Sequence, residues 1–324
     1  MRGIRIIPWV ALVGCAPALP GLPDAVPFEA VDGWVVETSV SPLQCPDGQD
    51  AVVVRVRPSS NDFSASALIL HSGAVDFVKE PLEADPTFGD HAAVEDRLSR
   101  DWSVRRIFST LGISPETDTT EVHRGTLIAA LAEAGVVSVL PGNCWGDRWH
   151  NDADQPNDAV ADAFERKGRE AALNAWDLLS DEQYLPPSET RYVIGLGDGG
   201  NGAAELLHVG IEAAGVLVDS SPDDLHSYTQ EPDLYADILE GLARTHPDNA
   251  YASGSLVDTS VPTVYAYAQY DGSLPIGIHS AALAELDAAG NTLVGVDSAE
   301  HVVSNADPEL ATSLVEALLS SPVP

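Results

Sequence analysis

The sequence predicts an α/β fold: a mostly parallel central sheet with helices on both faces. Short apolar runs such as "RYVIGLG" and "GVLVDSS" have the length and composition of strands, and helical patterns such as "NGAAELLHVGIEA" separate them. This alternation is typical of parallel strands joined by crossover helices that cover both faces of the sheet. With 324 residues, 44% of them hydrophobic and 20% charged, the chain can bury a core of domain size.

The expected elements follow one another in a regular order, starting with β-branched apolar runs and continuing with Ala- and Leu-rich helical patterns. Strands are expected at 33–40, 51–58, 66–73, 136–142, 191–197, 215–221, 263–271 and 292–297. Helices are expected at 126–135, 157–180, 201–213, 278–290 and 307–320. An irregular stretch at about 75–120 is interpreted as an insertion, and a small helical cap is expected at about 222–250. One domain is therefore predicted over 33–324.

The N-terminus has the layout of a secretory signal. "MRGIRIIPWVALVGC" contains two arginines and then an apolar stretch that is too short for a typical membrane-spanning helix. Its last four residues, Leu12 to Cys15, resemble the lipobox of bacterial lipoproteins. The resemblance implies that residues 1–14 are removed, that Cys15 carries lipid, and that the protein is anchored in the cell envelope. Ala16 after this cysteine favours the outer membrane.

Residues 15–32 are rich in proline and are interpreted as an extended tether between the lipid and the domain.

The formal net charge of −34 limits the partners of the protein. Lys79 and Lys167 are its only lysines. Such a surface repels nucleic acid and anionic membranes, so neither is expected as a partner apart from the membrane that holds the lipid. The charge fits a strongly solvated exterior or attraction of a cationic ligand, and a small-molecule ligand or substrate stays open.

Polar residues follow several of the expected strands. His71-Ser72-Gly73 ends the third strand, the glycine cluster "GLGDGG" at 195–200 follows the fifth, and Asp271 and His301 follow the last two. A sharp turn that could hold a nucleophile, then an acid, then a histidine is the chain order of the α/β-hydrolase fold. In this order and spacing, residues 33–321 resemble the α/β-hydrolase superfamily.

The resemblance implies a role for each of these positions. Family members carry the nucleophile between small residues in a strained turn, and "GLGDGG" places Gly197 where a serine is usual. Serine chemistry would then be lost. Asp271 and His301 resemble the acid and base of the triad, and His71, Ser72 and Gly73 resemble the oxyanion loop. Gly199 and Trp145 are further candidates for binding, and no metal or cofactor is expected.

Alternatives stay open for the nucleophile. Asp198 could attack as the aspartate of haloalkane dehalogenases and epoxide hydrolases does, with His301 as base and Asp271 orienting it. Asp198 could instead cap its own helix. Ser72 or Ser220 could be a nucleophile outside the elbow pattern, and Asp219 is an acid position in some relatives.

A fainter resemblance concerns "CPDGQDAVVVRVRP" and "ALILHSGA". These stretches are similar to the pectin-acetylesterase and Notum group of carboxylesterases, which need the serine that is absent here. The resemblance is therefore a hint about ancestry.

Cys45 and Cys144 are the cysteines that remain after Cys15. In an exported protein such a pair is often a disulfide. In the α/β-hydrolase fold the second strand runs against the others and lies next to the fourth. Cys45 would then lie in the turn before the second strand, near Cys144 at the end of the fourth. A disulfide between them is therefore expected.

Overall fold

The architecture is taken from a computed structural model. It describes residues 26–28, 34–44, 50–60, 63–71, 127–141, 165, 169–180, 184, 190–197, 199–220, 240–249, 261–270, 283–284, 287–288, 290–297, 303–305 and 308–320.

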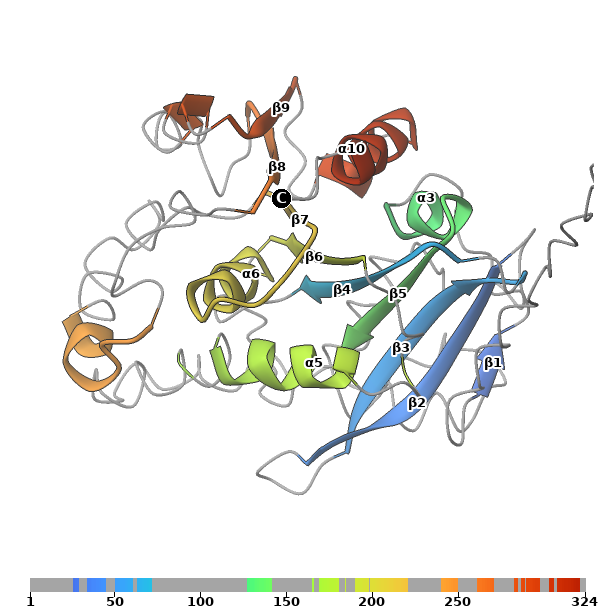
Figure 1. Cartoon of the computed structure of the whole chain (residues 1–324), viewed down its shortest axis with the longest axis horizontal. Coiled ribbons are helices and arrows are strands. Elements are labelled where there is room, and N and C mark those ends of the chain that lie inside the picture. The colour runs from blue at the N-terminus through green and yellow to red at the C-terminus, as the bar shows by residue number, and fades with distance from the viewer. Residues whose placement is uncertain are drawn as a thin grey trace, which may run out of the picture.

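Nine strands of the described residues form one sheet, in the order β1-β2-β3-β5-β4-β6-β7-β8-β9 (Figure 1). Their bounds are Val26–Phe28 (β1), Trp34–Gln44 (β2), Asp50–Pro58 (β3), Ala65–His71 (β4), Val136–Pro141 (β5), Arg191–Leu196 (β6), Gly215–Asp219 (β7), Thr263–Ala268 (β8) and Thr292–Val296 (β9). The five neighbouring pairs from β5 to β9 are all parallel. The predicted α/β class with a mostly parallel sheet is confirmed.

The first three strands depart from the parallel arrangement. β3 is antiparallel to β5, and β2 and β1 extend this edge as further antiparallel strands. The second predicted strand, β3, therefore runs against its neighbours and lies beside the fourth, β5, as expected. Cys45 and Cys144 lie outside the described residues, so their disulfide stays a prediction.

The sheet begins inside the segment that was expected to be a tether. Residues Val26–Phe28 form β1, with Val26 opposite Thr38 and Phe28 opposite Val36. A partner strand supplies the backbone hydrogen bonds that an extended, proline-rich segment lacks by itself. The rest of the expected tether, the signal segment and the expected insertion lie outside the described residues.

Helices cover the two faces of the sheet (Figure 1). α3 (Leu127–Glu133) and α10 (Pro308–Ser320) contact each other on one face, and α5 (Ala171–Ser180) and α6 (Gly199–His208) contact each other on the opposite face. A single helical turn, η4 (Val303–Asn305), precedes α10. The expected helices at 126–135, 201–213 and 307–320 correspond to α3, α6 and α10.

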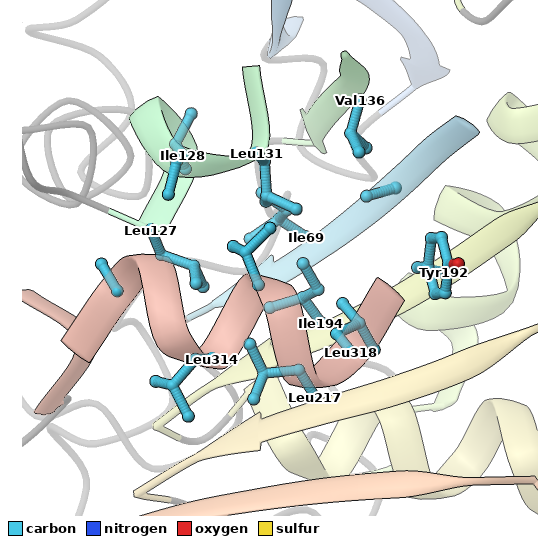
Figure 2. Packing of buried hydrophobic residues seen from close by; sticks show 14 of the residues in the cluster. Ile69, Leu127, Ile128, Leu131, Val136, Tyr192, Ile194, Leu217, Leu314 and Leu318 are labelled. Carbon is cyan, nitrogen blue, oxygen red and sulfur yellow. The ribbon is translucent and has the colours of Figure 1, made fainter. Parts of the chain in front are cut away.

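The core under α10 explains why this helix forms where it does. Ala311, Leu314, Val315 and Leu318 recur at spacings of three and four residues, so they make one apolar stripe. Figure 2 shows Leu314 and Leu318 of this stripe in one cluster with side chains of α3 and of the sheet. Pro308 at the first helical position suits a helix start, because its missing N–H would have no partner there.

The other face of the sheet is covered by small side chains. Ala172 and Ala175 of α5 and Ala203 of α6 are buried in the same cluster as Leu68 and Val193 of the central strands. All five residues of β7 are buried, as expected for a parallel strand covered on both faces. The small side chains of these helices let them approach the sheet.

A buried ion pair joins the two antiparallel strands β2 and β3. Arg55, whose side chain is 0% exposed, donates to Glu37 from Nε at 2.7 Å and to the carbonyl oxygen of Tyr184 at 3.2 Å. Arg57 contacts the same carboxylate at 3.4 Å. Burial lowers the pKa of Arg55, and the charge of Glu37 opposes that change. Removing one partner of such a pair costs more than the pair itself contributes, because the other charge stays buried.

The described part of the expected cap contacts the region before α5. Residues 240–245 are helical, and Asn249 donates from Nδ2 to the buried carboxylate of Glu165 at 2.7 Å. Glu165 also lies 3.6 Å from Arg169, one helical turn further along the chain.

Within the described ranges, no helix is both long enough and apolar enough to cross a membrane.

Candidate functional site

The strand register brings four positions to one level at the carboxyl edge of the sheet. His71 of β4 is opposite Leu196 of β6, Leu196 is opposite Asp219 of β7, and Asp219 is opposite Ala266 of β8. The turn after β6 therefore lies between the ends of β4 and β7. Ligands of parallel α/β sheets bind at this edge.

The turn between β6 and α6 is sharp. Gly197 has φ 54, in the left-handed region that glycine adopts at little cost, and it is buried. Its N–H donates to the carbonyl oxygen of Asp219 at 2.8 Å, and its own carbonyl accepts from the N–H of Gly200 at 3.1 Å. Because α6 begins at Gly199, the chain passes from strand to helix within two residues.

The glycines on either side of this turn touch one another. A Cβ on Gly195 would lie 2.5 Å from Cα of Gly200 and 2.8 Å from the carbonyl carbon of Gly199. Leu196, by contrast, points into the core under α10 and is 3% exposed. The packing therefore fits the frame of small residues centred on Gly197. In the frame centred on Asp198, Leu196 would have to take a small-residue position.

Asp219, at the end of β7, is a buried polar residue at this edge whose carboxylate accepts three hydrogen bonds. Its carboxylate is 0% exposed and accepts the N–H of Val303 on Oδ1 at 3.0 Å and the N–H of Ser304 on Oδ2 at 2.8 Å. Ser220 donates its hydroxyl to Oδ1 at 2.9 Å. These bonds compensate the cost of burying a carboxylate.

The pKa of Asp219 reflects both effects. Burial raises the pKa of this carboxyl above its ordinary 3.8, and the hydrogen bonds from Ser304, Ser220 and Val303 act in the opposite direction. Burial has the larger effect.

Ser220 has a structural role at this edge of the sheet. Its φ of 54 places a non-glycine residue in the left-handed region, and its side chain is 1% exposed. The hydroxyl donates to Asp219 and the N–H donates to the carbonyl oxygen of Ala266 at 2.8 Å. The structure therefore holds Ser220 as a buried donor, which does not favour it as a nucleophile open to substrate.

The described residues include only some of the predicted site. Gly197 and Gly199 lie in the turn, and the backbone of His71 lies at the end of β4. Outside the described residues are Ser72, Gly73, Trp145, Asp198, Asp271 and His301, together with Cys15. In the chain, Asp271 directly follows the exposed Tyr270, and His301 comes two residues before η4.

Sequence reasoning missed the extent of the bonding around Asp219. It marked this residue only as an alternative acid position. The one signal in the sequence was an aspartate that ends an apolar strand and is followed by serine. Its partners Val303 and Ser304 could not be found from this pattern, because they are more than 80 residues away in the chain. Among the described residues, no group of three or more potential ligands could hold a metal ion.

Comparison with known proteins gives the fold. No family model matches the sequence. No curated protein matches it either. Among solved structures, the acylaminoacyl peptidase of Pyrococcus horikoshii is 11% identical with a TM-score of 0.51, over 92% of this chain and 41% of that one. A candidate dipeptidyl aminopeptidase IV of Bacteroides ovatus is 11% identical with a TM-score of 0.54, over 90% and 36%.

A carboxyl esterase 2 of Tuber melanosporum aligns over 94% of this chain and 93% of its own, at 12% identity and a TM-score of 0.48. The chain spans about two fifths of the length of the two peptidases. Together with the strand order, the likeness to the two peptidases shows that this chain has the α/β-hydrolase fold, as the sequence predicted. At these identities the likeness concerns the fold alone.

We expect Gly195→Ala to destabilise the protein strongly, by about 3 kcal/mol, because the new Cβ would overlap backbone atoms of α6 that cannot move separately. Urea unfolding followed by circular dichroism measures this. Gly202→Ala is the matched control: its Cβ meets mainly the flexible end of Leu70, and alanine favours the helix, so its stability should stay within about 1 kcal/mol of the parent. Equal losses would contradict the close approach.

The pH dependence of stability should report on Asp219. Because the pKa of Asp219 is raised in the folded state, the folded state binds the carboxyl proton more tightly than the unfolded chain does. The protonated carboxyl therefore stabilises the fold, and this contribution is complete below about pH 3.8. That contribution is lost as the pH rises through the raised pKa. The free energy of unfolding of the parent minus that of Asp219→Ala should therefore fall as the pH is raised from 3.8. Urea titrations at several pH values measure it, and a difference that grows with pH would show that the hydrogen bonds outweigh burial.

Proposed function

We propose that this chain is an exported, lipid-anchored protein of esterase-like ancestry that binds a small molecule at a hydrolase site without hydrolysing it. The observation that carries the proposal is Gly197, which has φ 54 at the turn after β6. Gly195 and Gly200 touch beside it as the small residues of an elbow. A glycine at that position has no side chain to attack a substrate.

The proposed ligand site lies at the carboxyl edge around this turn. His71, Ser72 and Gly73 would line it from the end of β4, and Gly199 from the start of α6. Trp145 would add a flat aromatic face from the segment after β5, suited to stacking on a ring or a cation. Asp271 and His301 would keep the positions of the triad acid and base.

An aspartate-dependent hydrolase is the second candidate, because Asp198 directly follows the turn at Gly197. Its carboxylate would attack a carbon of the substrate, displace the leaving group and form an ester. Water deprotonated by His301, which Asp271 would orient, would then hydrolyse the ester and restore the carboxylate. Alkyl halides and epoxides are substrate classes of this step. At the acyl carbon of an ester the same attack would form an anhydride and release the alcohol, and hydrolysis of the anhydride would restore the carboxylate.

Restoring the nucleophile tests the proposal. The full chain should not hydrolyse short acyl p-nitrophenyl esters, whereas Gly197→Ser should exceed the parent at least about 100-fold, the range that a base-assisted nucleophile contributes. Gly197→Ala is the matched control, because it adds the same Cβ at φ 54 without the hydroxyl. Adding His301→Ala to Gly197→Ser should remove the gain.

Three outcomes would contradict the proposal, and the first is a Gly197→Ser variant that is as inactive as the parent. If the parent is active and Asp198→Asn abolishes that activity, the protein is an aspartate-dependent hydrolase. If the parent is active and both Gly197→Ser and Asp198→Asn leave the rate unchanged, the nucleophile lies elsewhere.

The proposed anchor has its own test. Cells expressing the full chain should incorporate radiolabelled palmitate into it, and Cys15→Ser should abolish the label because the thiol is the acceptor. Cys45→Ser is the matched control and should keep the label. A parent chain without label would contradict lipidation while leaving the proposed ligand site untouched.

A further inference from the structure

Asp219 joins two segments that are far apart in the sequence. Its carbonyl oxygen accepts from Gly197 in the turn after β6, at 2.8 Å. Its carboxylate accepts from Val303 and Ser304 of η4, at 3.0 and 2.8 Å. Main chain and side chain of one residue therefore connect the β6–α6 turn to the segment between β9 and α10.

Further contacts hold this connection in place. Asp219 is at the end of a fully buried strand, and Ser220 holds one carboxylate oxygen with its hydroxyl at 2.9 Å. Ser220 takes φ 54 there, a conformation that costs a non-glycine residue free energy and persists only where the surroundings impose it. The strained backbone therefore belongs to Ser220, the residue whose hydroxyl orients the carboxylate of Asp219.

We propose that Asp219 is a positioning residue, which sets the distance between the turn at Gly197 and η4. This inference rests on the proposed function, because the turn carries the proposed nucleophile position and η4 begins two residues after His301 of the proposed site. Asp219 acts through its neighbours and touches no ligand, since its carboxylate is 0% exposed and both of its oxygens already accept hydrogen bonds. The role of triad acid is left to Asp271.

Asp219 also anchors the chain two residues after His301 of the proposed site. His301 precedes Val303 by two residues, so chain geometry keeps their Cα atoms within about 8 Å of each other. On the other side, β9 is held at its end by the hydrogen bond from Gln269 N–H to the carbonyl oxygen of Val296, at 2.8 Å. The chain that carries His301 is therefore tied at both ends, and Asp219 provides the second tie.

Amide hydrogen exchange in the full chain tests the coupling without requiring activity. In Asp219→Asn the main-chain bond to Gly197 is retained, and only the side-chain acceptor changes. Relative to the amide of Leu68 in the central strand β4, the amides of Val303, Ser304 and Gly197 should all exchange at least about tenfold faster. Faster exchange at Val303 and Ser304 alone would overturn the proposal, because Asp219 would then be a local anchor of η4. No change at any of the three would overturn it as well.

Glu37→Gln is the matched control for loss of stability. It also removes a buried, hydrogen-bonded carboxylate, but one that lies between β2 and β3, away from this edge. The exchange of Gly197, Val303 and Ser304 relative to Leu68 should stay unchanged in this variant. The same acceleration in Glu37→Gln would overturn the proposal, since the effect would follow from general destabilisation.

A kinetic measurement separates positioning from mere stability. In the Gly197→Ser background, Asp219→Asn should lower kcat for a p-nitrophenyl ester at least about tenfold and change KM less than about twofold. An active Gly197→Ser whose kcat does not change with Asp219→Asn would overturn the positioning role. An inactive Gly197→Ser would refute the proposed function, and the exchange pattern alone would then decide whether Asp219 couples the two segments.

Ser220→Ala replaces Asp219→Asn if the latter does not fold. It removes one hydroxyl donor and leaves the carboxylate in place. The same three amides should exchange about threefold faster relative to Leu68. Unchanged exchange at Gly197 would overturn the proposal in this variant as well.

Discussion

The close approach of β6 to the start of α6 governs the arrangement at the carboxyl edge of the sheet. Gly195 and Gly200 lie so near each other that the backbone of Gly200 leaves no room for a Cβ on Gly195. The chain can therefore turn from strand to helix within two residues, with Gly197 at φ 54 in between. A longer loop would move the N-terminus of α6 away from the ends of β4 and β7, and the proposed site would lose its centre.

Asp219 adds a second constraint at the same edge. A buried carboxylate is costly unless donors surround it, and here three donors come from Ser220, Val303 and Ser304. The cost of burial thus makes the position of η4 specific, because a displacement of η4 would leave the carboxylate with Ser220 as its one remaining donor of the three. This specificity reaches the turn as well, since the N–H of Gly197 bonds to the carbonyl oxygen of the same residue.

Under the proposed function, Gly197 in the nucleophile position would leave the framework of a hydrolase in place and remove its attacking group. The small residues, the sharp turn and the strand order are all those of the α/β-hydrolase fold. Fold and chemistry are separable in this way because the fold depends on packing and hydrogen bonding throughout the sheet. The chemistry depends on a few side chains at its edge.

The sequence alone predicted the fold class, the succession of strands along the chain from β2 onward, and the turn at 195–200. These features follow from local patterns: alternation of apolar runs with helical periodicity, and glycines between a strand and a helix. β1 was missed, because a three-residue strand in a proline-rich segment has no pattern of its own and forms only against β2.

Tertiary structure alone decided which residues hold the carboxyl edge together. No local pattern distinguishes the aspartate in "GVLVDSS" from other strand-end aspartates, since its donors at Val303 and Ser304 lie 84 and 85 residues further along the chain. In the glycine turn the sequence already favoured the frame centred on Gly197, and the contact between Gly195 and Gly200 in space and the burial of Leu196 support that frame. Local sequence sets which elements form, and packing between distant elements sets which side chains meet.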